Sequence, residues 1–143
     1  ETVYEYYRYL SEQLDIGIAL WNHPDCGYVM SPELRARIAE LPNIVAIKYS
    51  VDRALYRELT RLAGDMILVS TASEEEWLEN IVELGWQLYL CSTPPFLLQT
   101  AVDQRINAYT QLAFDGKLAE FEAAGAQVVV IAGTLYFHSF AIQ

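Results

Sequence analysis

Basic side chains are scarce in this sequence. Its 143 residues include 9 lysines and arginines against 19 aspartates and glutamates, which gives a formal net charge of −10. Proteins that bind nucleic acid or an anionic membrane surface attract phosphates with clusters of basic residues. The composition therefore argues against a nucleic-acid partner and against a polybasic membrane site.

Cysteines and long apolar runs are scarce as well. Cys26 and Cys91 are too few for the disulfide framework of a small secreted domain, so we expect a reduced, cytoplasmic setting. No apolar run is long enough to span a bilayer, and no signal peptide is present, so we expect no membrane partner. The sequence begins with Glu1 rather than methionine, from which we expect that the native start is missing.

Two further absences concern cofactors. His23, His138 and the two cysteines do not have the spacing of a metal site, and we interpret both histidines as loop residues. No glycine-rich phosphate-binding loop is present, which weakens the case for a flavodoxin-like binding module. The sequence therefore predicts no metal and no cofactor.

What the sequence does contain is a regular alternation of helical and strand-like segments. Helices are predicted at residues 1–14, 31–41, 52–64, 73–85, 96–114 and 117–124. Strands are predicted at Ile16–Trp21, Ile44–Tyr49, Met66–Ser70, Gln87–Cys91 and Gln127–Ala132. This alternation is typical of an α/β protein with a parallel sheet, and the length suits a single domain over residues 1–143.

Lys48 is the clearest candidate for a catalytic residue in the chain. It ends the apolar run Ile44-Val45-Ala46-Ile47, which predicts a buried parallel strand. Burial disfavours a charged ammonium, and a neutral amine can form a Schiff base with a carbonyl compound. The alternative is a structural lysine that reaches out of the strand end or pairs with a carboxylate.

Polar and aromatic residues also follow the other predicted strands. The carboxyl ends of parallel strands meet at one edge of the sheet, where ligands bind in α/β proteins. The candidate substrate-binding residues at that edge are Trp21, Tyr49, Ser70, Thr71, Ser92, Thr93 and Tyr136. Each also has an ordinary structural interpretation, as a packing aromatic or as a residue that ends a strand.

Three stretches of the sequence resemble a known family. They are Leu20–Pro24 with Gly27 and Ser31–Leu34, then Leu41–Lys48, and finally Gln104–Phe121. The sequence is similar there to the dihydrodipicolinate synthase / N-acetylneuraminate lyase family of pyruvate-dependent class I aldolases. The resemblance implies that Lys48 is the lysine that forms an imine with a small 2-oxo acid such as pyruvate. It also implies that Trp21 and Phe137 replace tyrosines of the proton relay.

The order of the segments differs from the order in that family. Family members are (β/α)8 barrels about twice as long as this chain, and residues 124–136 resemble their fourth strand although they come last here. Joining Gln143 to Glu1 would restore the family order. We therefore expect a circularly permuted part of the barrel, strands four to eight, and an engineered or designed origin.

The permutation leads to a specific fold. The five strands would lie in the order 5-1-2-3-4, with helices on both faces of an open, doubly wound, flavodoxin-like sandwich. The connection from Phe96 to Ala124 would cover the second face. The alternative is a half-barrel whose inner face is buried by dimerisation, so that the protein is a monomer or a homodimer.

Two functions remain open at this stage. The first is a scaffold that keeps Lys48 but has no native activity, because Trp21 cannot relay protons and the carboxylate-gripping residues of the family belong to its early strands. The second is an active lyase or aldolase in which Lys48 forms an imine with a 2-oxo acid.

Overall fold

The structure is a computed structural model, and it describes residues 1–72, 76–88, 90, 100–117 and 119–120. The chain divides into two compact units. The first comprises Glu1–Ser73 and Leu84–Ser92, and the second comprises Glu74–Glu83 and Thr93–Gln143. Each unit is described by itself.

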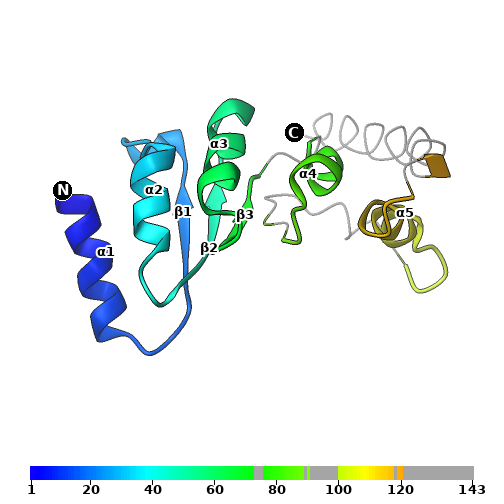
Figure 1. The fold of residues 1–143 in the computed structure, drawn as a ribbon. Coiled ribbons are helices and arrows are strands. Elements are labelled where there is room, and N and C mark those ends of the chain that lie inside the picture. The colour runs from blue at the N-terminus through cyan, green and yellow to red at the C-terminus, as the bar shows by residue number, and fades with distance from the viewer. Residues whose placement is uncertain (73–75, 89, 91–99, 118, 121–143) are drawn as a thin grey trace, which may run out of the picture. The chain divides into compact units, whose positions relative to one another are not determined.

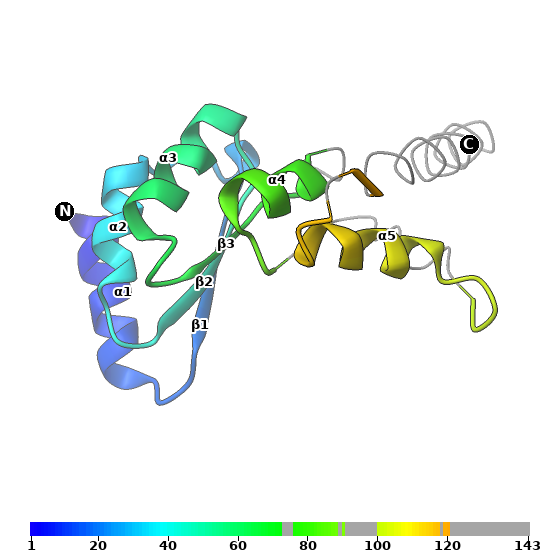
Figure 2. The same ribbon diagram turned by 45° about the vertical axis from the view of Figure 1, so that its right-hand side comes forward.

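The first unit is built on a small, open parallel sheet. Strands β1 (Ile18–Asn22), β2 (Ile44–Tyr49) and β3 (Leu68–Ser70) lie side by side in the order β1-β2-β3. Helices α1 (Thr2–Gln13), α2 (Pro32–Ala39) and α3 (Arg53–Ala63) alternate with them along the chain, and a short 3-10 turn, η1 (Pro24–Cys26), follows β1. Figures 1 and 2 show α2 and α3 along one face of this sheet.

The first three predicted strands and their order are confirmed, but five strands are not shown among the described residues. Gln87, Leu88 and Leu90, from the predicted fourth strand, are not in a strand. The backbone N–H of Leu90 donates instead to the side chain of Ser70, at 2.9 Å, rather than to a backbone carbonyl of β3. The predicted fifth strand, Gln127–Ala132, lies outside the described residues.

The core of the first unit lies between the sheet and its helices. The residues that are almost completely buried come from β2, α2 and α3, and they are Ile47, Tyr49, Ile38, Tyr56, Leu59 and Ala63. Trp86 packs against Tyr56 with ring centroids 5.0 Å apart, and its indole N–H donates to the Thr60 hydroxyl at 3.0 Å. Burying such side chains stabilises each by about 1.5–3 kcal/mol, which makes this layer the main source of stability.

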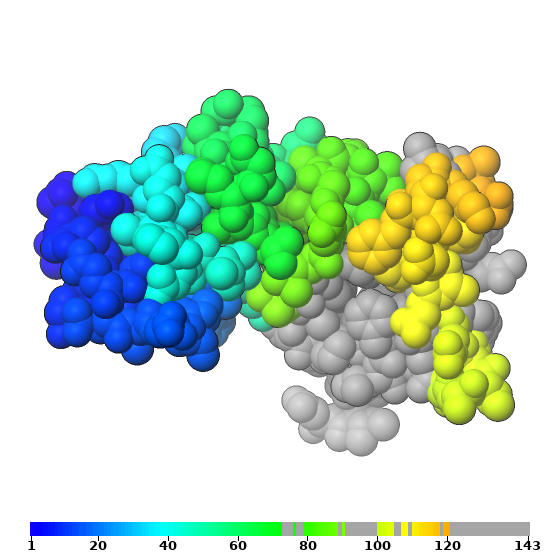
Figure 3. Space-filling model, turned by 60° about the horizontal axis from the view of Figure 1, so that its bottom comes forward, coloured from blue at the N-terminus to red at the C-terminus, as the bar shows by residue number. Residues whose placement is uncertain are grey.

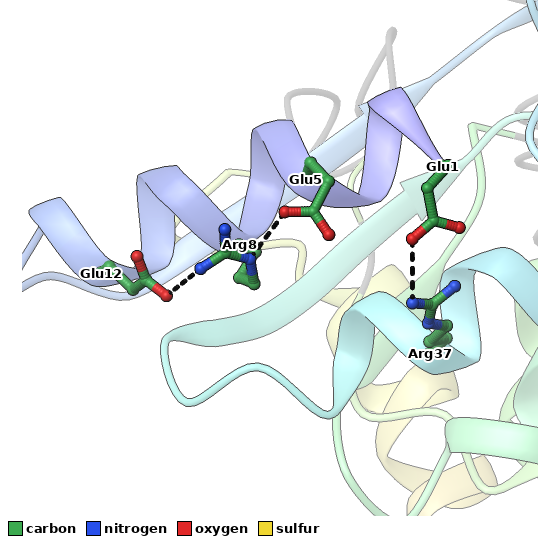
Figure 4. Close-up of polar contacts among 5 residues, drawn as sticks. All are labelled: Glu1, Glu5, Arg8, Glu12 and Arg37. Atoms are coloured by element: carbon green, nitrogen blue, oxygen red, sulfur yellow. Dashed lines mark hydrogen bonds and ion pairs between the residues drawn. The ribbon is translucent and has the colours of Figure 1, made fainter.

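Helix α2 begins as the sequence predicts. The Ser31 hydroxyl accepts a hydrogen bond from the Leu34 N–H at 3.3 Å, and Pro32 occupies the first turn. Arg37, in the last turn, lies over the Tyr4 ring of α1 at 3.9 Å and reaches Glu1 (Figure 4). Arg8 of α1 sits between Glu5 and Glu12 in the same view. The Arg8 pairs lie within α1, and all of these ion pairs are exposed, so each contributes little to stability.

Asn43 fixes the end of α1 against the start of β1. Its side-chain amide donates to the carbonyls of Ser11, at 3.0 Å, and Leu14. Its side-chain oxygen accepts from the Ser11 hydroxyl at 3.3 Å, and its backbone carbonyl accepts from the Ile18 N–H at 2.6 Å. One side chain therefore satisfies carbonyls that the end of a helix leaves without partners.

The second unit contains α5 (Arg105–Phe114) and most of α4 (Trp77–Leu84). Helix α5 is shorter than the predicted helix 96–114, because residues 100–104 are not helical. The Thr100 hydroxyl accepts from the N–H groups of Val102, at 3.3 Å, and Asp103, at 3.0 Å, and so forms a turn. Gly116, with a φ of 68°, provides the predicted break after α5.

No helix among the described residues is both long and apolar enough to cross a membrane. Helix α1 lies at the surface of the first unit, as the blue atoms in Figure 3 show, and it exposes Tyr6 and Tyr9.

The contacts of Asn43 lead to a stability prediction. Replacing Asn43 with alanine should lower the free energy of unfolding by about 1–3 kcal/mol, because carbonyls at the end of α1 lose their donors. Urea unfolding followed by far-UV circular dichroism measures this change. Gln13→Ala, an exposed side chain in the last turn of α1, is the control and should change the free energy by less than about 0.5 kcal/mol. Equal effects of the two substitutions would contradict the role of Asn43.

Candidate functional site

Three of the predicted site residues form a row across the sheet. Trp21 of β1 is paired with Lys48 of β2, and Lys48 is paired with Ser70 of β3. Paired residues of parallel strands point to the same face, and their neighbours Leu20, Ile47 and Val69 are buried in the core. The row therefore lies on the sheet face opposite α2 and α3, near the carboxyl ends of the strands.

Lys48 holds the centre of this row. Its side chain is half-buried, and its Nζ lies 5.9 Å from the centroid of the Trp21 indole ring. Trp21 itself is 60% exposed and contacts the His23 ring, with centroids 6.1 Å apart. The amine and the indole are thus placed as a cation–π pair at the edge of the sheet where ligands of α/β proteins bind.

Two of the predicted hydroxyl residues, Ser70 and Tyr49, already have structural partners. Ser70 is completely buried, and its Oγ accepts from the Leu90 N–H and donates to the Thr71 carbonyl at 3.4 Å. Tyr49 points into the core, where its hydroxyl donates to the Met30 carbonyl at 2.6 Å. The hydroxyl groups of Ser70 and Tyr49 therefore have a structural role at the strand ends.

Ser92, Thr93 and Tyr136 lie outside the described residues, so the predictions for these three side chains remain predictions.

An open pocket of about 500 Å³ lies beyond the carboxyl ends of the strands. Its polar lining comes from the residues that follow each strand, namely His23, Ser50, Asp52 and Thr71. The Ser50 hydroxyl oxygen is buried with no hydrogen-bond partner. Of these four residues, the sequence predicted only Thr71 as a substrate-binding residue, although His23 and Ser50 lie two residues beyond Trp21 and Lys48 and could have been included by that spacing.

Sequence reasoning also missed Arg35, a buried side chain behind the row. Arg35 is only 1% exposed. Its guanidinium donates to Asn22 Oδ1 and to the Met30 carbonyl, the latter at 3.4 Å, and it lies over the Tyr49 ring at 3.9 Å. Its Nη1 has no partner, and no carboxylate is paired with it among the described residues.

Burial shifts the pKa values of this group of residues. Loss of solvation lowers the pKa of the Arg35 guanidinium from its usual range, and the neighbouring Tyr49 opposes the shift. Burial also raises the pKa of the Tyr49 and Tyr7 hydroxyls, against the opposing field of Arg35. Desolvation therefore dominates the electrostatics behind the row.

No cluster of three or more potential metal ligands occurs within the described part of the chain.

Comparison with known proteins identifies the family. The sequence profile of the Dihydrodipicolinate synthetase family matches residues 1–142. The chain belongs to this family. The 4-hydroxy-tetrahydrodipicolinate synthase of Thermotoga maritima is 35% identical over 52% of this chain, and that of Thermotoga sp. (strain RQ2) is 46% identical over the same share. Each match covers 28% of the relative, so the chain spans well under half of these enzymes.

Solved structures of dihydrodipicolinate synthases share the fold. The synthase of Aquifex aeolicus matches with a TM-score of 0.72 at 19% identity, over 94% of this chain and 45% of its own. A putative synthetase from Pseudomonas aeruginosa matches with a TM-score of 0.71 at 25% identity, over 94% of this chain and 46% of its own. The open three-stranded sheet is consistent with part of the dihydrodipicolinate synthetase barrel.

The Arg35 contacts lead to an asymmetric stability prediction. Asn22→Leu should lower the free energy of unfolding by about 3 kcal/mol, because it removes an acceptor from a buried guanidinium. Arg35→Met should cost less than about 1 kcal/mol, because Asn22 keeps the Met30 N–H and the Met30 carbonyl keeps the Tyr49 hydroxyl. Urea unfolding of both variants measures the difference. A larger loss in Arg35→Met than in Asn22→Leu would refute this account.

The raised pKa of Tyr49 leads to a prediction about alkaline pH. The folded state keeps the Tyr49 proton to a higher pH than the unfolded chain does, so stability should fall as the pH rises above the ordinary tyrosine value of about 10. Tyr49→Phe should lose part of this slope, although it also loses the hydrogen bond to Met30. Urea midpoints at pH 8 to 11 (about half-unit steps) measure the slope. Parallel slopes in the parent and in Tyr49→Phe would show that Tyr49 does not contribute.

Proposed function

We propose that this chain carries the imine-forming lysine of a class I aldolase site, Lys48, and that it does not complete an aldolase cycle by itself. The observation that supports this best is the position of Lys48 at the carboxyl end of the central strand, paired with Trp21 on the ligand-facing edge. The family match over residues 1–142 supports the same assignment.

The proposed chemistry is a condensation between the Lys48 amine and a small 2-oxo acid. The neutral Nζ attacks the C2 carbonyl carbon, a C–N bond forms, and the carbonyl oxygen leaves as water. The product is an imine whose protonated form draws electrons from the neighbouring carbon. Turnover then needs a group that removes a proton from C3 and one that holds the substrate carboxylate.

Those two groups are the reason for proposing an incomplete cycle. Trp21 replaces the relay tyrosine of the family, and an indole N–H is neither an acid nor a base at neutral pH. The resemblance places the hydroxyl groups that bind the substrate carboxylate on early strands of the family barrel. The part of the barrel that this chain resembles is strands four to eight. Ser70, the nearest hydroxyl in the row, is already engaged with Leu90 and Thr71. Complete lyase activity remains the alternative.

The origin and setting of the chain stay predictions. Residues 124–136, on which the circular permutation and the engineered origin depend, lie outside the described part of the chain. The family match over residues 1–142 does not require a rearranged order. A homodimeric half-barrel and a cytoplasmic location likewise remain open for experiment.

Imine formation can be tested by trapping. The protein is incubated with pyruvate and sodium borohydride, and the reduced adduct is located by peptide mass spectrometry. Pyruvate is the first choice because the synthase of Acinetobacter baumannii, with 20% identity and a TM-score of 0.72, was solved with pyruvate bound. The chain has only two lysines, Lys48 and Lys117, so the adduct is easily assigned.

The trapping experiment has a matched control. We expect a stoichiometric adduct in the parent and in Lys117→Ala, and none on the corresponding peptide in Lys48→Ala. Exchange of the pyruvate methyl protons with D2O, followed by NMR, tests the incomplete cycle and should stay close to the rate without protein. An unlabelled Lys48 would overturn the imine assignment, and rapid methyl exchange would overturn the incomplete cycle.

A further inference from the structure

Trp21 lies beside Lys48 but takes no part in the condensation step proposed above. The indole is paired in register with Lys48, its ring centroid is 5.9 Å from Nζ, and more than half of its surface is exposed. The geometry therefore places the ring of Trp21 within cation–π distance of the amine.

The indole acts differently on the two cationic forms of the Lys48 nitrogen. An ammonium is compact and strongly hydrated, so it loses water when it approaches an aromatic face. A protonated imine carries the same charge on a planar C=N group with a single N–H, and it therefore holds water less tightly. Cation–π attraction is strongest for tryptophan and grows as the cation is desolvated. The contact thus favours the iminium over the ammonium from which it forms.

We propose that Trp21 is a binding residue for the Lys48 iminium and makes this chain a covalent trap for small 2-oxo acids. This inference rests on the proposed function. The covalent step is the condensation described above, in which the C–N bond forms and water leaves, and it needs no further reactant. The indole stabilises the adduct but offers no base for the C3 proton, so the trapped adduct returns to the free 2-oxo acid by hydrolysis.

The first test compares variants in the borohydride assay at several pyruvate concentrations. Trp21→Leu should raise the concentration needed for half-labelling of Lys48 by about two- to five-fold, and Trp21→Phe should raise it less. Tyr9→Leu removes a comparably exposed aromatic ring, 59% against 60%, and should match the parent. Urea unfolding shows that each variant is folded. Identical labelling curves for the parent and Trp21→Leu would overturn the proposal.

A second measurement tests the contact without any 2-oxo acid. Reductive methylation with ¹³C-formaldehyde converts both lysines to dimethylammonium groups that keep their charge, and Lys117→Arg leaves only the Lys48 signal apart from the amino terminus. We expect the ring current of Trp21 to shift the Lys48 methyl signal upfield, and Trp21→Leu to abolish the shift. A signal unchanged by Trp21→Leu would reject the contact. An upfield shift in a protein that pyruvate does not label would show that the contact between Trp21 and Lys48 exists and that the proposed function is wrong.

Discussion

The contacts of one buried guanidinium determine how the rest of the site is held. Arg35 lies beneath the strand ends and contacts Asn22 at the end of β1, Tyr49 at the end of β2, and Met30 in the segment between η1 and α2. Asn22 and Tyr49 are themselves paired in register, and they directly follow Trp21 and Lys48. The cation on the opposite side of the sheet therefore contacts the residues that directly follow both the indole and the amine in sequence.

This arrangement is unusual because no carboxylate of the described residues neutralises the cation. Neutral oxygens and an aromatic face surround the guanidinium in place of a carboxylate. They do not satisfy every N–H donor, since Nη1 has no partner. Such contacts compensate only part of the cost of desolvation, which is why burial lowers the pKa of Arg35. What the protein gains is specificity of geometry. Each group that contacts the guanidinium belongs to a different segment, and the contacts form only when these segments are aligned.

The sequence predicted the parts of this fold that follow from local pattern. The run Ile44–Tyr49 became β2 with the predicted bounds, and Ser31-Pro32 began α2, because apolar runs and capping residues act within a few positions. Arg35 could not be separated by type from Arg37, which is exposed one half-turn away. The spacing of Arg35 to Ile38 and Ala39 is the available signal, and it competes with the general rule that arginine stays at the surface. The predicted fourth strand is not shown among its described residues, because the Leu90 N–H pairs with the side chain of Ser70, a tertiary contact that local pattern does not reveal.

Under the proposed function, the site separates two properties that a complete aldolase combines. Lys48 lies near the end of the central strand beside neighbours whose own partners are fixed, and the proposed condensation needs only this amine and a 2-oxo acid. Proton transfer needs an acid–base group at the substrate, and the residue that faces Lys48 is an indole. In the proposal, the side chain that replaces the relay tyrosine supplies a surface on which a planar cation is more stable than an ammonium. We therefore propose that a tryptophan at position 21 favours retention of the substrate over turnover.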